Sequence, residues 1–248
     1  MLQAFSITDI GKRRKLNQDY VFVSEGMIGN LPNLFIVADG MGGHNAGDYA
    51  SKYTVEMIEK QIRTTGQMDT ETILSDAIKR ANSDIRGIAS NDESLSGMGT
   101  TVVVATVSDD VLQVANVGDS RLYIIRQNEI RQITRDHSLV EEMVRMGGID
   151  RLAARSHPDK NIITRAVGAL DSIEVDFFRE ELKRGDMILL CSDGLTNMLE
   201  DEEIREIIGR ETLLSEKGKQ LVDAANENGG KDNISVILIA PYAEHDAK

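Results

Sequence analysis

The sequence predicts a layered α+β protein in which mostly antiparallel sheet is covered by pairs of helices. Its segments run as strands, two helices, many strands, two helices and a last strand, whereas a doubly wound sheet would alternate strands and helices regularly. Several strand-like segments are joined by short turns such as Ser108–Asp110 and Gln127–Glu129, which allow antiparallel hairpins but no parallel crossover. With 248 residues, 41% of them apolar, the chain can bury one large core.

The individual elements follow from the apolar pattern. Short apolar segments bounded by turn residues predict strands at Leu2–Thr8, Asp19–Ser24, Leu34–Ala38, Thr101–Val107, Val111–Val117, Arg121–Arg126, Ile130–Thr134, Ile173–Phe178, Met187–Ser192 and Ile234–Ala240. Apolar stripes with helical spacing cover Asn45–Arg63 and Asp69–Ala89, which follow one another and can form a hairpin. A second helix pair is predicted around Ile204–Ile208 and Leu221–Ala225.

A single domain accounts for residues 1–240, because no repeat, low-complexity tract or change of composition divides them. A less regular insert runs from Arg135 to Gly168, where Ser138 and Glu141 form a capping-box pattern that predicts a short helix. Residues 241–248 are predicted to form a C-terminal tail.

Charge and cysteine content narrow the function and the compartment. The 41 acidic residues outnumber the 28 basic ones and give a net charge of −13, which disfavours nucleic acid as the main partner and suits sites for hard cations. No apolar run approaches the ~18 residues of a membrane span, the N-terminus has the wrong charge order for a signal peptide, and Cys191 is the single cysteine. We therefore expect a cytoplasmic protein without membrane insertion. The basic run GKRRK, Gly11–Lys15, stands apart, although a solvated turn would explain it.

Four aspartates stand where strands begin or end. FIVADG places Asp39, VLQVANVGDS places Asp119, MILLCSDG places Asp193, and GGKDN places Asp232 before the last strand. One Asp-Gly pair is common turn chemistry, but four such positions indicate carboxylates that converge at one end of the sheets. Packed carboxylates repel unless cations neutralise them. Oxygen donors suit Mg²⁺ or Mn²⁺, whereas four scattered histidines and one cysteine fit a zinc site poorly.

Two such cations about 4 Å apart would lower the pKa of a shared water and favour attack on a phosphate ester. Gly40, directly after Asp39, leaves room for an ion to approach the main chain. Arg14 is the candidate for gripping the phosphate, because a guanidinium matches phosphate oxygens.

Rival hydrolase signatures are missing from the sequence. Six positions after Cys191 stands Asn197, where a cysteine phosphatase would have arginine, so Cys191 is expected to be a buried packing residue. No Asp-x-Asp pair follows a strand, and no G-x-S-x-G elbow occurs.

Eight segments together resemble the metal-dependent protein phosphatases of type 2C, in particular their bacterial serine/threonine branch. They occur in the family's order and span about Leu2–Ala240: TDIGKRRKLNQD, ADGMGGHNAG, GMGTT, ANVGDSRLY, TRDHSLV, HPDKNIITRAVG, LLCSDGLTN and GGKDNISVILI. The resemblance implies a sandwich of two mostly antiparallel sheets flanked by helix pairs, α-β-β-α, with metals at one end. It also implies that the Arg135–Gly168 insert is a mobile flap near the substrate entrance.

The same resemblance implies a ligand set for the metals. Asp39 would bridge two Mn²⁺ or Mg²⁺ ions, and the Gly40 carbonyl would bind the second. Asp193 and Asp232 would complete the first site, while Asp119 with Asp193 would bind a third ion. A water or hydroxide between the two core ions would attack the phosphorus of phosphoserine or phosphothreonine directly, with no phosphoenzyme.

The resemblance also bears on four further positions, Asp19, Arg14, Met41 and His44. Asp19 matches a position that holds the second ion through water, and Arg14 matches the phosphate-gripping arginine. Eukaryotic members read DGHxG and use that histidine as the general acid, whereas Met41 stands here. His44 is a candidate substitute, although a lone loop histidine is more often a bystander. A metal-bound water is the other proton source.

We therefore expect a monomeric protein serine/threonine phosphatase whose partners are phosphorylated proteins and a cognate Ser/Thr kinase. Two other classes of function fit less well. A phosphoprotein-binding module on a degenerate scaffold is disfavoured by the intact Asp39, Asp193 and Asp232. A metal-dependent enzyme acting on nucleotides or nucleic acid is disfavoured by the net charge and by the shortage of aromatic side chains for base stacking.

Overall fold

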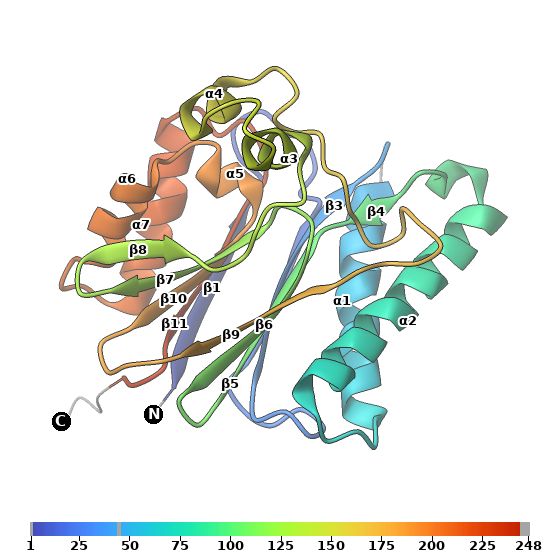
Figure 1. Ribbon diagram of the computed structural model, residues 1–248, viewed down its shortest axis with the longest axis horizontal. Helices are drawn as coiled ribbons and strands as arrows, with labels where there is room; N and C mark the ends of the chain where they lie inside the picture. Colours follow the sequence, from blue (N-terminus) through green and yellow to red (C-terminus); the bar gives the residue numbers. More distant parts are fainter. Residues whose placement is uncertain (1, 44–45, 244–248) are drawn as a thin grey trace.

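The computed structural model describes residues 2–43 and 46–243, whose strands form two sheets (Figure 1). One sheet contains β2 (Asp19–Ser24), β3 (Leu34–Met41), β4 (Gly99–Thr100), β5 (Val102–Ser108), β6 (Val111–Val117) and β9 (Asp176–Glu181). The other contains β1 (Gln3–Asp9), β7 (Arg121–Arg126), β8 (Glu129–Gln132), β10 (Met187–Cys191) and β11 (Ile234–Ala240). The helices are α1 (Ala46–Thr64), α2 (Thr70–Asn91), η1 (Glu93–Leu95), α3 (Leu139–Arg145), α4 (Arg151–Ser156), α5 (Asp193–Thr196), α6 (Asp201–Ile208) and α7 (Leu214–Glu227).

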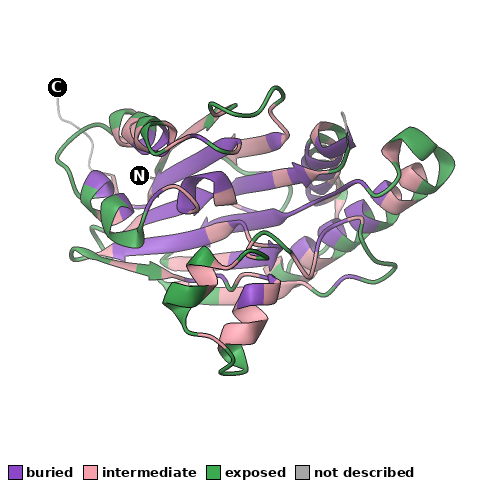
Figure 2. Cartoon of the chain, turned by 90° about the horizontal axis from the view of Figure 1, so that it is seen from above, coloured by how far each residue is buried: buried purple, intermediate pink, exposed green. Residues whose placement is uncertain are grey.

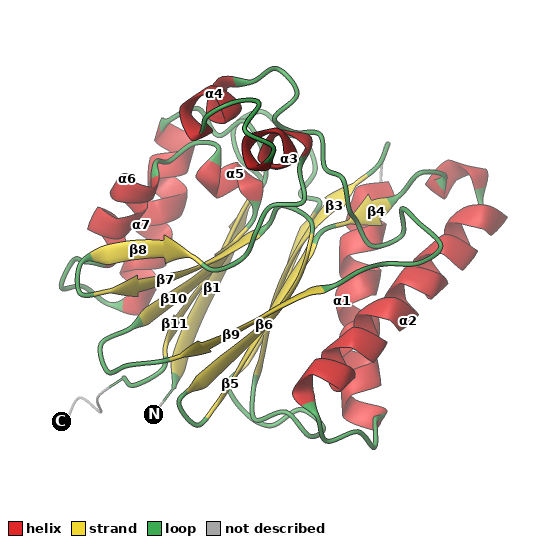
Figure 3. Ribbon diagram, viewed as in Figure 1, coloured by secondary structure: helices red, strands yellow, loops and turns green. Residues whose placement is uncertain are grey.

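The strands of both sheets pair antiparallel. The first sheet has the order β2-β3-β5-β6-β9, with β4 paired to β3, and the second has the order β1-β11-β10-β7-β8. Figure 3 shows the two sheets lying between helices, with α1 and α2 on one side and α6 and α7 on the other. The predicted α+β class and the α-β-β-α sandwich are confirmed.

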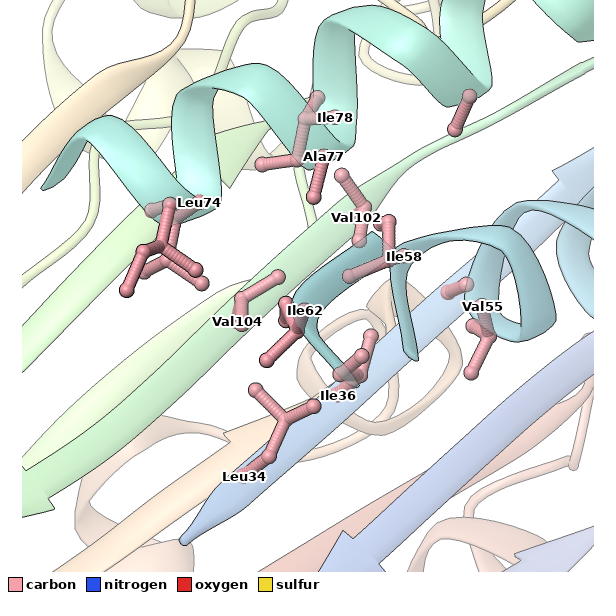
Figure 4. Close-up of a cluster of buried hydrophobic side chains, with 14 of the residues drawn as sticks. Leu34, Ile36, Val55, Ile58, Ile62, Leu74, Ala77, Ile78, Val102 and Val104 are labelled. Carbon is pink, nitrogen blue, oxygen red and sulfur yellow. The ribbon is translucent and has the colours of Figure 1, made fainter. Parts of the chain in front are cut away.

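Alternation along β3 explains why its apolar run is nearly continuous. Leu34 and Ile36 pack with side chains of α1 and α2 (Figure 4), while Phe35 and Val37 belong to the core between the sheets. Because successive side chains of a strand point to opposite faces, both faces of this strand must be apolar. Asp39 continues the set of Phe35 and Val37, which places it on the inner face at the end of the sandwich.

The second sheet is built by the same rule. Leu190 and Ile237 pack into the core between the sheets, whereas Leu189 and Cys191 pack against α5, α6 and α7. Burial raises the pKa of the Cys191 thiol, which is fully buried, so the expectation of a packing cysteine is confirmed. Figure 2 shows that burial is concentrated in the central strands and in the helix faces against them.

Most strand predictions hold within one or two residues, and two differences bear on the site. The strand predicted to stop at Ala38 continues to Met41, because β4 pairs with it through Gly40 and Thr100. The strand predicted from Ile173 begins only at Asp176. Among the described residues, no helix is long and apolar enough to cross a bilayer.

The insert at residues 135–168 covers one end of the sandwich (Figure 1). The Ser138 hydroxyl caps α3 by accepting a hydrogen bond from the Glu141 amide at 3.3 Å. The carboxylate of Glu141 pairs with Arg151 of α4, a helix that the sequence did not predict. At the other end of the chain, Tyr242, placed by the sequence in the tail, donates a hydrogen bond to Asp110 at 2.7 Å.

Candidate active site

Five aspartates come together at the end of the sandwich under the 135–168 insert. Asp19 and Asp39 are direct partners across the β2–β3 pair. Asp193 begins α5 just after β10, and Asp232 lies just before β11. Because β10 and β11 are antiparallel, the C-terminal end of β10 and the N-terminal end of β11 lie at the same end of the sheet. Asp119 follows β6 and comes close enough for its charge to act on Asp39.

Two glycines beside these aspartates allow backbones to approach closely. A Cβ atom on Gly40 would lie 2.0 Å from the carbonyl oxygen of Gly47 in α1. A Cβ on Gly194 would lie 1.9 Å from the carbonyl oxygen of Asn233. We predicted that Gly40 leaves room for an ion, but on its Cβ side the space is taken by the start of α1. The Asp-Gly pairs therefore hold the strand ends and helix starts together.

Burial and mutual repulsion dominate the electrostatics of the cluster. Burial raises the pKa of Asp39 well above its usual value, and the charges of Asp19, Asp193, Asp119 and Asp232 raise it further. The same causes raise the pKa of Asp19 to about 7 and that of Asp193 to about 6. The pKa of Asp119 is also well above its usual value, first because of burial and then because of Asp193. Full ionisation of this cluster at neutral pH requires compensating positive charge.

Each of two central carboxylates uses one oxygen in a hydrogen bond and keeps the other without a partner. Asp19 Oδ2 accepts from the Ser192 hydroxyl at 2.7 Å, and Asp193 Oδ2 accepts from Asn197 Nδ2 at 2.9 Å. The Oδ1 atoms of Asp19 and Asp193 are buried and have no hydrogen-bond partner in the described part of the chain. Buried oxygens of this kind, in an all-carboxylate setting, fit the ligand preference of Mg²⁺ and Mn²⁺.

Arg14 lies against this cluster, since its Nη2 atom is 2.6 Å from Asp232 Oδ2. Both side chains are partly exposed, at 47% for Arg14 and 32% for Asp232. Within residues 2–43 and 46–243, no three His, Cys, Asp or Glu side chains are arranged to hold an ion directly. One oxygen of each of Asp19, Asp193 and Asp232 accepts a hydrogen bond from a protein donor.

A cleft of about 390 Å³ opens beside the cluster, between the 135–168 insert and the segment of α5 and α6. Asp119 and Asp193 contribute to its wall. Two basic residues of the insert form hydrogen bonds across the cleft. Arg155 donates to the Leu199 carbonyl at 2.7 Å, and Lys160 donates to Asn197 Oδ1 at 2.9 Å. The insert therefore contacts the same asparagine that hydrogen-bonds Asp193.

The sequence reasoning missed several residues that support the carboxylates. Asn197 was considered only as a position that lacks arginine, and the contact of Ser192 with Asp19 was not foreseen. Arg121 binds Asp136 through two nitrogens, at 2.7 and 3.0 Å, and its charge lowers the pKa of Asp119. These residues lie inside the motifs LLCSDGLTN, ANVGDSRLY and TRDHSLV. The motifs indicated the region of the site, but the contacts between these side chains could be identified only from the folded structure.

The proton donor is not identified by this geometry. Met41 is half-buried and pairs with Gly99 across β3 and β4, and its thioether has no proton to donate, so it offers no acid at this position. His44, the candidate acid from the sequence, lies outside the described residues.

The fold and the site define a class of protein: a four-layer α-β-β-α sandwich that gathers carboxylates at one end, in an environment that calls for divalent cations. The model of the protein phosphatase 2C family matches residues 11–238. The chain therefore belongs to the protein phosphatase 2C family and is a phosphoprotein phosphatase, a hydrolase.

The similar proteins agree on this class. The serine/threonine phosphatase Stp of Listeria monocytogenes is 42% identical over 238 residues, covering 94% of this chain and 93% of its own. The protein phosphatase PhpP of Streptococcus pneumoniae is 40% identical over 98% of both chains. Among solved structures, the S. agalactiae serine/threonine phosphatase has a TM-score of 0.91 at 38% identity, covering 98% of this chain and 100% of its own. The catalytic domain of the phosphatase PstP, in complex with two manganese ions, has a TM-score of 0.86 at 30% identity, covering 98% and 99%.

Proposed function

We propose that this phosphatase hydrolyses phosphoserine and phosphothreonine in proteins and that its carboxylate cluster holds two Mn²⁺ or Mg²⁺ ions, with a third beside them. The observation that carries the proposal is the convergence of five aspartates at one end of the sandwich. Burial and mutual repulsion raise the pKa of Asp39, Asp19, Asp193 and Asp119, and two buried carboxylate oxygens have no hydrogen-bond partner among the residues that the structure describes. An ion that replaces protons on these groups would relieve the cost of burying their charge.

The assignment of ligands rests on the match of these residues to the motifs of the family. Asp39, Asp193, Asp232 and the carbonyl of Gly40 would hold the two core ions. We assign Asp119, with Asp193, to the third ion. Asp19, which accepts a hydrogen bond from Ser192, would hold the second ion through water.

Divalent cations at this cluster supply Lewis acidity, which lowers the pKa of a water and offsets the charge of the phosphate. We propose that the activated water attacks phosphorus directly, because no cysteine or serine in a nucleophile motif serves the site and Cys191 is buried on the helix side of the sheet. Arg14, once released from Asp232, presents its guanidinium to the substrate phosphate. His44 remains our candidate for protonating the leaving oxygen.

The setting of the reaction is proposed on the same basis. We propose one catalytic domain over residues 1–240, with the 135–168 insert as a flap at the substrate entrance and residues 241–248 as a tail whose Tyr242 packs back against the domain. We further propose a cytoplasmic, monomeric enzyme that opposes a cognate Ser/Thr kinase. The name of the similar Listeria monocytogenes protein, a serine/threonine phosphatase, supports the choice of phosphoserine and phosphothreonine as substrates.

The test is a side-by-side assay of phosphoserine, phosphothreonine and phosphotyrosine peptides. We expect turnover of the first two, loss of turnover with a chelator, recovery with Mn²⁺ or Mg²⁺, and resistance to okadaic-type inhibitors of the other metallophosphatase class. Peptide binding without phosphate release would instead indicate a binding module. Preference for phosphotyrosine, or full turnover after chelation, would contradict the proposal.

A further inference from the structure

The run Gly11–Lys15, called here the basic loop, carries side chains that the proposed chemistry does not use. Lys12, Arg13 and Lys15 are exposed, and their side chains form no hydrogen bond or ion pair with any residue that the structure describes. Arg131, which is also largely exposed, pairs with a glutamate at 2.7 Å. The basic loop therefore holds unpaired positive charge in a chain whose net charge is −13.

The conformation of the basic loop is set by hydrogen bonds. The amide nitrogens of Lys12 and Arg13 both donate to the Gly230 carbonyl, at 2.8 and 3.1 Å. The side-chain amide of the buried Asn233 donates, at 2.9 and 3.0 Å, to the carbonyls of the two residues that flank the loop, Ile10 and Leu16. One buried amide thus clamps both ends of the loop beside Asp232. The loop is preorganised at the site, so binding there costs little ordering of its backbone.

The unpaired charges lie beside the residue that we assign to the phosphate. Arg14 occupies the middle of the loop and reaches Asp232. Lys12 and Lys15 are one or two residues away, so their Cα atoms lie within ~7 Å of that of Arg14. A group bound by them would be a near neighbour of the phosphate that Arg14 grips.

The positive charge extends from the basic loop toward the cleft. Lys231 is exposed and directly follows Gly230, the residue that accepts the two loop amides. Burial lowers the pKa of Lys160 in the insert, and the charges of Arg155 and Lys231 lower it further. Lys231 is therefore close enough to the cleft wall for its charge to be felt there. The basic loop and Lys231 form a basic edge on one side of the carboxylate cluster.

Several like charges held side by side repel one another, and no carboxylate of residues 2–43 and 46–243 forms an ion pair with Lys12, Arg13 or Lys15. Such an arrangement complements an anionic group of a ligand, and exposed charges of this kind act mainly on selectivity and encounter. Resting on the function proposed above, we propose that the basic loop is a second anion subsite. It binds a carboxylate or a second phosphate that lies within about three residues of the phosphoresidue being hydrolysed.

The test compares three phosphothreonine peptides of equal length at low ionic strength. One has neutral flanks, one has glutamates within three residues on either side, and one has a phosphoserine there. Each kcat/KM is divided by the rate of the same preparation on p-nitrophenyl phosphate, which has no flanking charge. The variant is Lys12→Gln/Lys15→Gln, and the matched control is Lys52→Gln/Lys79→Gln, which removes the same charge from exposed positions on α1 and α2.

We expect the wild-type protein to prefer at least one of the acidic peptides by about fivefold, through KM and not kcat, as a few exposed ion pairs would give. The preference should fall to about one in Lys12→Gln/Lys15→Gln and persist in the control. Comparison of the glutamate-flanked peptide with the phosphoserine-flanked peptide shows whether the subsite binds a carboxylate or a phosphate. Equal use of neutral and acidic peptides by the wild type, as a merely solvated turn would give, overturns this subsite while the proposed function stands. A preference that survives in the variant, or that disappears equally in the control, overturns it as well. Failure to hydrolyse any of the peptides overturns the proposed function itself.

Discussion

Strand β10 has an aspartate at each end, and the two differ in how they are satisfied. Asp186, before the strand, is 3% exposed, and both of its oxygens accept hydrogen bonds from Arg126, at 2.7 and 2.6 Å. It also accepts from the Lys183 amide at 2.8 Å. Asp193, after the strand, accepts one hydrogen bond from Asn197 and keeps a buried oxygen without a partner among the described residues. Burial and the charge of Asp232 raise the pKa of Asp193 to about 6.

The difference shows that Asp186 has a structural role, whereas Asp193 is available to bind a ligand. At the Asp186 end, the fold supplies the counter-ion, so the charge contributes to a closed structural contact. At the Asp193 end, the neighbouring side chains include further carboxylates, and only one of the two Asp193 oxygens accepts a side-chain hydrogen bond among the described residues. Carboxylates that lack counter-ions lower the stability of the folded chain unless protons or cations neutralise them, and such local costs to stability are expected at functional positions.

Asp39→Asn should have the largest effect, because it removes a charge from the centre of the cluster. We expect kcat/KM on a phosphothreonine peptide to fall by about 10³-fold or more, as removal of one strong electrostatic contact to a transition state does. Circular dichroism should show an unchanged fold. Full turnover in this variant would mean that the ligands have been assigned wrongly.

Asp186→Ala should act on stability instead of catalysis. Loss of this carboxylate leaves the Arg126 guanidinium without its bidentate partner, and we expect the free energy of unfolding in urea to fall by about 3 kcal/mol. The folded fraction should keep its kcat/KM within about twofold. A variant as stable as the wild type would show that the two ends of β10 do not differ as described.

Asn197→Ala should reduce activity by about tenfold, the usual range for a residue that orients a metal ligand. The change removes the hydrogen bond to Asp193 and the acceptor of Lys160. Asn228→Ala is the control, because Asn228 also donates through Nδ2, to the Met198 carbonyl, but touches no carboxylate. Equal activities of the two variants would argue against a positioning role.

The smallest effect is the pH dependence of stability in chelated protein. The pKa values of Asp19 and Asp193 are raised from 3.8 to about 7 and about 6, so the folded state retains protons that the unfolded chain releases. This contribution is complete below the unfolded pKa and is lost as pH rises through the folded values. Tm should therefore rise as the pH is lowered from about 8 to about 5, by about 3 °C for each kcal/mol of added stability. Saturating Mn²⁺ should abolish the rise, since ions compete with protons. Parallel curves with and without Mn²⁺ would contradict the account.

Much of the fold could be read from the apolar pattern. The strands Asp19–Ser24, Val111–Val117, Arg121–Arg126 and Ile234–Ala240 have the predicted bounds, because each is a short, mostly apolar segment between turn residues. Helix α4 could not be read in this way. None of its residues is buried, so it has no apolar stripe, although Asp150 caps it by accepting from the Ala153 amide at 2.7 Å.

Some residues of the site could also be predicted from the sequence, and others could not. Asp39, Asp193 and Asp232 could be predicted because each follows or precedes a strong strand signal. Asn197 stands four residues after Asp193, at helical spacing, but α5 has only four residues and gives no periodic signal. The contacts of Arg14 with Asp232 and of Lys160 with Asn197 join residues far apart in the chain, and only the fold brings them together.

Calorimetric titration of the chelated protein with Mn²⁺ tests the central claim most directly, because it counts ions without relying on turnover. We expect the wild type and Asp186→Ala to bind at least two ions with similar affinity, and Asp39→Asn to lose binding at both core sites. If Asp39→Asn bound as many ions as the wild type with the same affinity, the unsatisfied end of the sandwich would not be the metal site.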